Sequence, residues 1–391
     1  MTMKATDPGA FRAQTPVLFD RASDFIARNV FERPTLVLDL ARVEVQYDAL
    51  KAGLGDASIH YAVKANPDAR IIAALLAKGS HFDCASRAEI ELCLSQGARA
   101  DQISFGNTIK RATDIAFAAS KGISLLAADA PEELEKIAAH APDARVYLRV
   151  IVENSQADWP LSRKFGAAGG HVLSLLEQGR ALGLSMVGLS FHVGSQTRKS
   201  VYWGPVLDQI AKVWENAQQA GFELGLLNIG GGFPAFYGEA VDAPTNYAAD
   251  VIRQVRARFG DVQIIAEPGR GMVAEAGHIV AEVLLVARKS PLDAHRWVFL
   301  DIGKFSGLAE TMDEAIRYEF VTAKDGSDTG PCILAGPSCD SADVLYEKTP
   351  VQLPKSLASG DRIIVRNCGA YTTTYASIGF NGFPPLDVVV L

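Results

Sequence analysis

Short apolar runs alternate with amphipathic segments through the part of the chain that precedes Gly271. The runs have the length and composition of buried strands, and the segments between them have the spacing of surface helices. Eight strands are expected, at 59–65, 80–85, 102–107, 123–129, 145–152, 185–193, 224–231 and 262–269. Eight strand–helix units over about 230 residues predict a (β/α)8 barrel. An open doubly wound sheet is the alternative, but it does not require a count of eight.

The pattern changes after Gly271, where segments of β type are separated by turn residues and little helix is expected. Examples are HRWVFLDIG (295–303) and DRIIVRNCGAYT (361–372). We therefore predict two domains. The barrel is assigned to residues 41–271, and an all-β domain is assigned to residues 272–391 together with residues 1–40.

Composition excludes several classes of function. The formal net charge is −7 and no basic run is present, which argues against a nucleic-acid partner. The five cysteines show no CxxC spacing, which predicts a reducing compartment and no zinc or other metal site. No apolar run has the length of a membrane span, and the first residues lack the apolar core of a signal peptide. We expect a cytoplasmic protein with no membrane partner.

Polar residues stand where the expected barrel strands end. Barrel enzymes carry their chemistry at the carboxyl ends of the strands, so these residues are expected to share one face. In chain order they are Lys64, Asp83, Asn107, Arg149, His192 with Ser195, Gly230, Gly231 and Gly232, and Glu267 with Arg270.

Lys64 is the central candidate. Desolvation at the end of a buried strand lowers the pKa of a lysine and makes its amine a nucleophile, as a Schiff base with an aldehyde cofactor requires. On its own, Lys64 better fits a strand-end side chain that reaches solvent. The other residues of this face decide between the two interpretations.

The glycine run 230–232 and the EPGR sequence 267–270 follow the last two expected strands, where barrels often bind phosphate. Glycines allow backbone N–H groups to approach the oxygens, and Arg270 adds charge-assisted hydrogen bonds. Glu267 fits the partner of a protonated pyridine nitrogen, although an ion pair with Arg270 is an alternative. His192 is placed to stack on a flat ring. Together with Lys64, these features indicate pyridoxal 5'-phosphate (PLP).

Seven motifs carry a resemblance that covers nearly the whole chain from about residue 30. In chain order they are YAVKAN, FDCAS, SFHVGSQ, NIGGGFP, AEPGR, GPSCDSAD and GAYTTTYAS. In these motifs the chain resembles the fold-type III PLP-dependent decarboxylases, above all the bacterial ornithine decarboxylases. The resemblance implies an alanine-racemase-like barrel with a β domain, and the decarboxylation of L-ornithine to putrescine in polyamine biosynthesis.

The resemblance also implies roles for single residues. Lys64 matches the Schiff-base lysine, His192 the ring-stacking histidine and Glu267 the partner of the pyridine nitrogen. Asp83 and Arg149 match residues near the lysine amine and the phenolic oxygen of the cofactor. The residues that match phosphate binders are Ser195, Gly230, Gly231, Gly232, Arg270 and Tyr371.

Cys339 and Asp340 match a pair that a second subunit contributes, so the resemblance implies a homodimer with shared sites. Cys339 is expected to donate a proton and Asp340 to contact the distal amine of a basic amino acid. The segment 304–320 departs from the eukaryotic members. We expect further substrate contacts from Tyr318 and Glu319, with Asp313 and Glu314 as acidic alternatives.

Three alternatives remain from the sequence. Lysine differs from ornithine by one methylene, so an ornithine/lysine decarboxylase that also makes cadaverine fits the same residues. Racemisation is a further alternative within the enzymes. A catalytically silent regulator on the same fold belongs to a different class, and the presence of Lys64, Glu267 and Cys339 argues against it.

Overall fold

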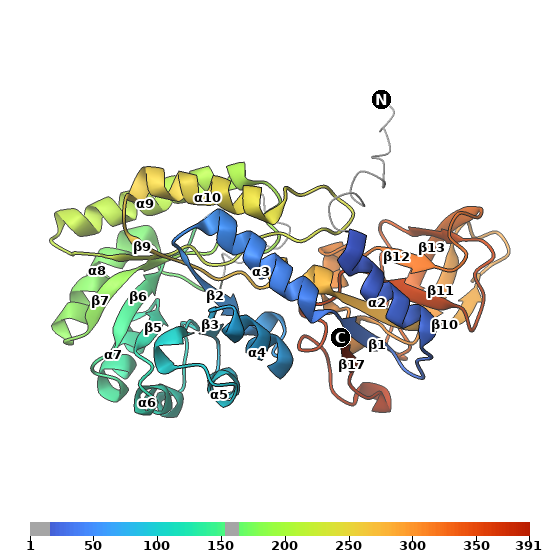
Figure 1. Ribbon diagram of the computed structural model, residues 1–391, viewed down its shortest axis with the longest axis horizontal. Helices are drawn as coiled ribbons and strands as arrows, with labels where there is room; N and C mark the ends of the chain where they lie inside the picture. The colour runs from blue at the N-terminus through green and yellow to red at the C-terminus, as the bar shows by residue number, and fades with distance from the viewer. Residues whose placement is uncertain (1–15, 153–163) are drawn as a thin grey trace. The chain divides into compact units, whose positions relative to one another are not determined.

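The computed structural model describes residues 16–152 and 164–391 of the protein, and Figure 1 shows them as a ribbon. Residues 1–15, which the sequence assigned to the β domain, lie outside the described part. The described residues form two compact units. The first comprises residues 16–43, 275–314 and 318–391, and the second comprises 44–152, 164–274 and 315–317.

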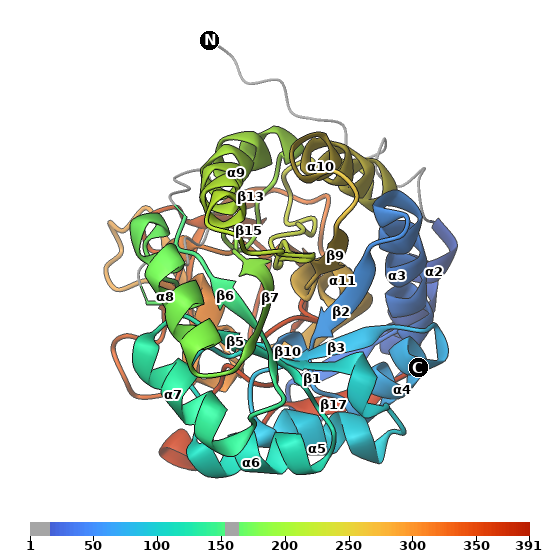
Figure 2. The same cartoon turned by 90° about the vertical axis from the view of Figure 1, so that its left-hand side faces the viewer.

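The second unit is a closed barrel whose eight parallel strands follow one another in chain order. The barrel closes where the first strand pairs with the last, with Ser58 opposite Ile265 and Ile59 opposite Ala266. Figure 2 looks into the barrel and shows the helices around its outside. The strands are β2 (Ser58–Ala62), β3 (His81–Cys84), β4 (Ile103–Phe105), β5 (Leu125–Ala128), β6 (Arg145–Arg149), β7 (Ser185–Ser190), β8 (Leu226–Asn228) and β9 (Gln263–Ala266).

One helix precedes each barrel strand. Their apolar faces cover the sheet, and Val251 and Val255 of the last helix, for example, are fully buried. The helices are α3 (Leu40–Leu54), α4 (Ala69–Ala77), α5 (Arg87–Ser95), α6 (Ala112–Ser120), α7 (Pro131–His140), α8 (Gly169–Ala181), α9 (Trp203–Gln219) and α10 (Pro244–Phe259). The predicted barrel is therefore confirmed, and its strands are shorter than the apolar runs that predicted them.

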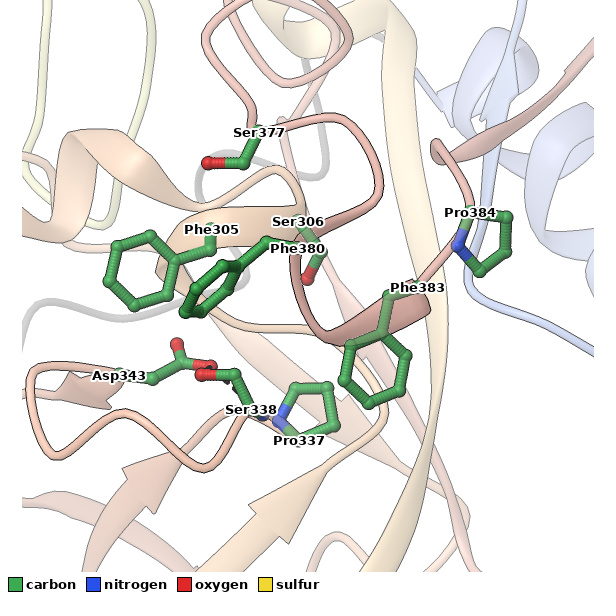
Figure 3. A pocket seen from close by; sticks show the side chains of 9 residues that line it. All are labelled: Phe305, Ser306, Pro337, Ser338, Asp343, Ser377, Phe380, Phe383 and Pro384. Carbon is green, nitrogen blue, oxygen red and sulfur yellow. Dashed lines mark hydrogen bonds between the residues drawn. The ribbon is translucent and has the colours of Figure 1, made fainter.

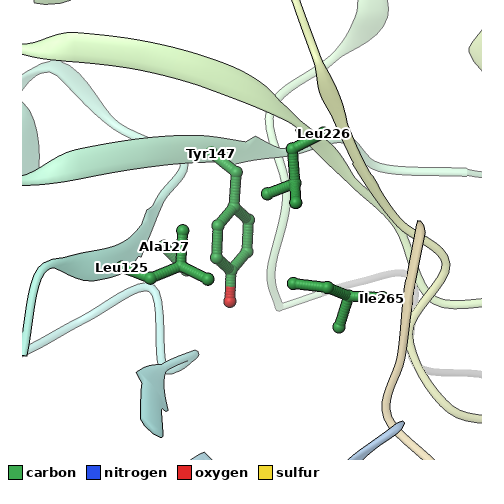
Figure 4. Packing of buried hydrophobic residues seen from close by; sticks show 5 residues of the cluster. All are labelled: Leu125, Ala127, Tyr147, Leu226 and Ile265. Atoms are coloured by element: carbon green, nitrogen blue, oxygen red, sulfur yellow. The ribbon is translucent and has the colours of Figure 1, made fainter. Parts of the chain in front are cut away.

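Apolar side chains from β5, β6, β8 and β9 pack against one another (Figure 4). Leu125, Ala127, Tyr147, Leu226 and Ile265 form this cluster. Alternation along each strand places the second residue after a core residue on the same inward face. Asn228 therefore follows Leu226 toward the carboxyl end of the barrel, and Glu267 follows Ile265. The packed interior supports the polar residues that stand at this end.

The first unit is a mixed sheet of nine strands, most of which pair antiparallel. Its longest strand, β10 (Gly277–Ala287), pairs with three neighbours and anchors the sheet. The remaining strands are β1 (Thr35–Leu38), β11 (Arg296–Leu300), β12 (Phe320–Thr322), β13 (Thr329–Ala335), β14 (Val344–Leu345), β15 (Val351–Pro354), β16 (Arg362–Val365) and β17 (Asp387–Val390). The predicted all-β second part is thereby confirmed.

The N-terminal part of the described chain adds one helix and one strand to this unit. In α2 (Pro16–Arg28), Ala22 and Ile26 pack with Val37 of β1 and Val280 of β10. In the part of the chain that the structure describes, no helix combines the length and the apolar character that a bilayer crossing requires.

Candidate active site

Lys64 lies just beyond β2, in a single 3-10 turn formed by Val63–Ala65. The sequence placed it at the end of a longer, buried strand, and the structure corrects that expectation, because 49% of its side chain is exposed. Its ammonium nitrogen, Nζ, lies 3.7 Å from Oδ2 of Asp83. Because Lys64 lies in this turn and not in the strand, its amine is accessible at the carboxyl end of the barrel. Asp83 is its acidic neighbour there.

Asp83 belongs to the inward face of β3 and is 4% exposed. Its Oδ1 atom faces Gly106, where an added Cβ would lie only 1.9 Å away, so glycine is needed at that position. Burial raises the pKa of Asp83 above its usual value, while the charges of Lys64 and Arg149 and hydrogen bonds from Lys64 and Ser104 lower it. Burial outweighs these opposing effects, so the pKa of Asp83 lies above its usual value.

A group of polar residues continues from Asp83 into the barrel, and sequence reasoning missed it. The Nδ1 atom of buried His60 lies 3.2 Å from the hydroxyl of Ser104, and the His60 and His81 rings lie 4.9 Å apart. Burial lowers the pKa of His60 to about 3, so its ring is neutral. The sequence does show polar residues at inward positions of β2, β3 and β4. Which of them touch one another depends on the strand register, which the sequence does not reveal.

The glycine run is shaped by Asn228, the last residue of β8, which is fully buried. Its Oδ1 accepts a hydrogen bond from the N–H of Gly230 at 2.9 Å. Gly230 and Gly232 have φ angles of 67° and 97°, in the region that favours glycine. A Cβ on Gly231 would lie 3.0 Å from Nε2 of His192, so a side chain at this position would crowd the imidazole ring.

Glu267 follows β9 and accepts a 2.5 Å hydrogen bond at Oε1 from the side-chain amide of Asn228. Burial and the charge of Asp83 raise the pKa of Glu267 to about 7, although Lys64, Asn228 and Arg149 act in the opposite direction. A carboxyl group with this pKa can hold or release a proton near neutral pH. Asn228 is thus a positioning residue that the motif NIGGG contained but sequence reasoning did not assign.

His192 lies in the loop after β7, two residues beyond the strand end. Its Nδ1 accepts a hydrogen bond from the N–H of Gly194 at 2.9 Å. Burial, together with the charges of Arg149 and Lys64, lowers its pKa well below 6.5. The ring is therefore neutral, with Nδ1 as the acceptor and the proton on Nε2, and it is fixed in orientation as a stacking surface requires.

Arg270 is 4% exposed and begins the short helix α11 (Arg270–Val273). Its Nε and Nη2 atoms donate to the hydroxyl of Ser195 at 3.2 and 3.1 Å. Its Nη1 donates to the hydroxyl of Tyr237 at 3.1 Å. The structure thus joins the predicted residues Ser195 and Arg270 and adds Tyr237, which the sequence did not indicate.

Tyr147 is another residue that sequence reasoning missed. It is 1% exposed in the barrel core, and Figure 4 shows its ring among the apolar side chains of the cluster. Burial raises its pKa well above 10, and the charges of Glu267 and Asp83 add to the shift. The phenol therefore stays protonated beneath the two carboxyl groups. Its apolar neighbours in sequence, Val146 and Leu148, made it look like an ordinary core residue.

Five of the predicted residues belong to the first unit. Cys339 is exposed, and both its N–H and its Sγ face Oδ1 of Asn381, at 3.1 and 3.5 Å. Asp340 is also exposed, and its Oδ1 accepts a hydrogen bond from the N–H of Ala342 at 2.8 Å. A small pocket lies beside this loop, with Ser338 and Phe380 among its lining residues (Figure 3).

The loop of Cys339 is organised by Asp343, which is 2% exposed. Its carboxylate accepts hydrogen bonds from the N–H of Lys304 at 2.7 Å and from the hydroxyl of Ser338 at 2.7 Å. A Cβ on Gly303 or Gly336 would lie 2.2 Å from its oxygens. These contacts fix the chain immediately before Cys339.

The other three residues differ in their surroundings. Tyr318 is 6% exposed, and its N–H donates to the hydroxyl of Tyr346 at 2.9 Å. Glu319 is partly buried with its Oε2 3.5 Å from Nη1 of Arg366. Tyr371 is half-buried with a positive φ of 63°.

The two acidic alternatives also differ. The side chain of Asp313 is 92% exposed and lies 3.9 Å from Nζ of Lys348. Glu314 accepts hydrogen bonds from the N–H groups of Lys348 and Thr349. Asp313 is thus the more accessible of the two.

The raised pKa of Glu267 predicts a stability effect with a defined sign. Between about pH 4.5 and pH 7, the folded protein keeps a proton on Glu267 that the unfolded chain has released, so stability falls as pH rises through this window. In cofactor-free protein, Glu267→Gln should remove this loss. Its free energy of unfolding should exceed that of wild type by at most about 3 kcal/mol above pH 7.

Urea unfolding midpoints of both proteins at about pH 5 and about pH 8 measure this difference. Equal changes in the two proteins between these pH values would contradict the assignment of the raised pKa to Glu267.

The residues at the carboxyl end of the barrel fit PLP on their own chemistry. Lys64 offers an accessible amine, and the bare glycine turn with Ser195 and Arg270 offers donors for a phosphate. Glu267, with its pKa near 7, offers a carboxyl group to a pyridine nitrogen. All these groups follow strands of one barrel in the sequence.

Comparison with known proteins gives the same answer. A family profile described as pyridoxal-dependent decarboxylase, pyridoxal binding domain, matches residues 40–274. Ornithine decarboxylase of Schizosaccharomyces pombe is 34% identical over 370 residues, which span 91% of this chain and 82% of the relative. Antizyme inhibitor 2 of Xenopus laevis is 31% identical over 390 residues, which span 92% of this chain and 84% of the relative.

The solved structure of lysine/ornithine decarboxylase from Vibrio vulnificus, complexed with cadaverine, has a TM-score of 0.84 to this chain at 33% identity. The similarity covers 95% of this chain and 98% of that one. The resemblance drawn from the motifs and the predicted cofactor are thus confirmed. Since the profile spans more than half of the chain and the relatives align along most of it, the protein belongs to the fold-type III pyridoxal-phosphate-dependent decarboxylases.

Proposed function

We propose that the protein decarboxylates L-ornithine to putrescine in the cytoplasm, as a step of polyamine biosynthesis. The observation that carries this proposal is the group at one end of the barrel: Lys64 beside Asp83, Glu267 with a pKa near 7, and Arg270 held by Ser195. The ornithine decarboxylase of Schizosaccharomyces pombe and the lysine/ornithine decarboxylase of Vibrio vulnificus support a basic amino acid as the substrate.

Bound PLP supplies an electron sink for the carbon that loses carbon dioxide. Lys64 would hold the aldehyde carbon of the cofactor, with Asp83 and Arg149 near the amine and the phenolic oxygen. Ser195, the glycine turn 230–232 and Arg270 would bind the phosphate, and we propose Tyr371 as a further phosphate ligand.

The chain controls protons and orientation around that carbon. Glu267 would share its proton with the ring nitrogen of bound PLP, and Asn228 fixes the orientation of that carboxyl group. The neutral ring of His192 provides a flat face without adding positive charge. We assign Cys339 as the proton donor to the substrate carbon.

Substrate selection is assigned to Asp340, with Tyr318 and Glu319 as further contacts. A carboxylate in a closed site is left unpaired by an apolar amino acid, so it favours a substrate with a distal ammonium group. Asp340 is exposed in its own unit and therefore available to a ligand. Glu319 already has Arg366 as a partner, which makes Asp340 the stronger candidate.

Asp340→Ala should raise KM for ornithine by roughly 10- to 100-fold, because it removes the charged partner of the distal amine. The affinity for PLP should change little. Steady-state kinetics and a cofactor titration measure the two effects separately. Asp328→Ala is the matched control, since the Asp328 side chain is 92% exposed in the same unit. Equal losses of substrate and cofactor affinity would instead assign Asp340 to the structure of the loop.

We also propose a homodimer in which Cys339 and Asp340 of one subunit complete the site around Lys64 of the other. The resemblance to family members supports this arrangement, and the exposure of both residues in their own unit is compatible with it. An isologous dimer of this kind places two equivalent sites at one interface.

The similarity to antizyme inhibitor 2 favours a regulator as the second candidate. A regulator has no need for Lys64, Glu267 and Cys339 together, and this chain retains all three. An absorption band shifted to longer wavelength than that of free PLP, in purified protein loaded with PLP, separates the two functions, because bonding of the lysine to the cofactor produces this shift. Protein without such a band would favour the regulator.

A further inference from the structure

The guanidinium of Arg270 donates hydrogen bonds to hydroxyl groups on two different loops. Ser195, after β7, accepts from Nε and Nη2, while Tyr237, after β8, accepts from Nη1. A guanidinium only donates hydrogen bonds, so each hydroxyl must act toward it as an acceptor. The Tyr237 ring also lies against the cation, with its centroid 5.8 Å from Cζ of Arg270.

The side chain of Gln196 joins the two loops through two hydrogen bonds to Ala235, which we call the brace. Oε1 of Gln196 accepts from the N–H of Ala235 at 3.0 Å, and its Nε2 donates to the carbonyl of Ala235 at 2.5 Å. Gln196 is 2% exposed and has a positive φ of 58°, a conformation that non-glycine residues adopt rarely. Gln196 adjoins Ser195 in sequence, and Ala235 stands two residues before Tyr237. The brace therefore sets the separation of the two hydroxyls.

The backbone adds a second tie between the same loops. The N–H of Thr197 donates to the carbonyl of Gly232 at 3.1 Å, so the loop of Ser195 also holds the end of the glycine turn. The guanidinium of Arg270 is planar, and these contacts already fix its orientation. It therefore loses little conformational entropy when it binds phosphate, which increases the affinity of the site for phosphate.

From these contacts we propose that Tyr237 is a further positioning residue of the phosphate site, which orients Arg270 toward the cofactor phosphate and is itself placed by Gln196. The inference rests on the proposed role of Arg270 as a phosphate ligand. It extends that role by naming the residue on β8's loop that fixes the arginine.

The test compares two probes in the full-length chain freed of cofactor: pyridoxal 5'-phosphate and pyridoxal, which lacks the phosphate. Tyr237→Phe should weaken the affinity for pyridoxal 5'-phosphate about tenfold, the size expected for one hydrogen bond to a charged group. Its affinity for pyridoxal should equal that of wild type. The visible band measures both affinities without any turnover.

Tyr247→Phe is the matched control. The Tyr247 hydroxyl donates to the carbonyl of Thr197 at 2.5 Å and accepts from Nε1 of Trp203 at 2.8 Å, so it supports the same region through other contacts. This variant should bind the two probes in the wild-type ratio. A loss of both probes in Tyr237→Phe, or an unchanged ratio, would overturn the proposal.

Two further variants keep the proposal testable if Tyr237→Phe folds poorly. Gln196→Leu should give the same selective loss for pyridoxal 5'-phosphate, and an unchanged ratio there would count against the brace. In an Arg270→Lys background, Tyr237→Phe should have almost no additional effect, because the hydroxyl acts through the guanidinium. Additive losses would overturn the proposal. Wild-type protein that does not distinguish the probes would instead reject the phosphate role of this site.

Discussion

Lys64→Ala should abolish the visible band of the PLP-loaded protein and reduce turnover by roughly 10⁴-fold or more, as for the loss of a residue that bonds covalently. The expectation follows from the position of the amine, accessible in the turn after β2 and 3.7 Å from Asp83. Absorption spectra and single-time-point product assays measure both effects.

Lys64→Arg is the matched control for charge. It keeps a cation next to Asp83 but cannot form a covalent bond with an aldehyde, so it should lose the band and the activity as fully as alanine does. An unchanged spectrum in Lys64→Ala, or substantial activity in Lys64→Arg, would contradict the assignment of Lys64.

Mixing two inactive variants should restore activity if the site is shared between subunits. Lys64→Ala and Cys339→Ala each leave every site of their own homodimer with one lesion. After subunit exchange at equal amounts, about half of the dimers are mixed, and each mixed dimer has one site with both lesions and one with neither. Activity should therefore recover to about a quarter of wild type.

The control for this experiment is exchange itself, which differently tagged subunits demonstrate by co-purification. Mixing Lys64→Ala with Lys64→Arg should restore nothing, because no combination supplies an intact lysine. If exchange is complete and the Lys64→Ala and Cys339→Ala mixture stays inactive, each chain builds its own site and the proposed dimer is wrong.

The sequence predicted the architecture because the pattern of the barrel is local. Eight apolar runs separated by helical segments specify strand and helix without knowledge of any distant contact. The same logic placed Lys64, Asp83, His192 and Glu267 at one end of the barrel. After Gly271, short apolar segments of β type alternate with turn residues, and this change of pattern likewise predicted the all-β sheet.

The sequence predicted the details of Lys64 poorly. The apolar run YAVKAN continues through Val63 and Ala65, but the strand stops at Ala62 because the chain forms a 3-10 turn there. Hydrophobicity is equally high in a buried turn and in a strand, so the run alone does not locate the strand end. The half-exposed lysine follows from that turn.

The contacts that support the site could not be predicted, because each joins residues distant in sequence. Asn228 with Glu267, Arg270 with Tyr237 and His60 with Ser104 meet only when the barrel closes in its observed register. Alternation indicates which residues point inward, but not which inward residues touch. The roles of Tyr318, Glu319, Tyr371, Cys339 and Asp340 stay predictions for the same reason.

The comparison of kcat/KM for ornithine, lysine, arginine and diaminopimelate, with carbon dioxide and diamine both quantified, tests the central claim most directly. We predict equal amounts of carbon dioxide and putrescine from ornithine, at a kcat/KM about tenfold or more above that of lysine, since one methylene changes binding by about 1–3 kcal/mol. Diaminopimelate should react poorly because Asp340 repels its distal carboxylate. A preference for lysine, arginine or diaminopimelate, or no release of carbon dioxide from any of the four, would contradict the account.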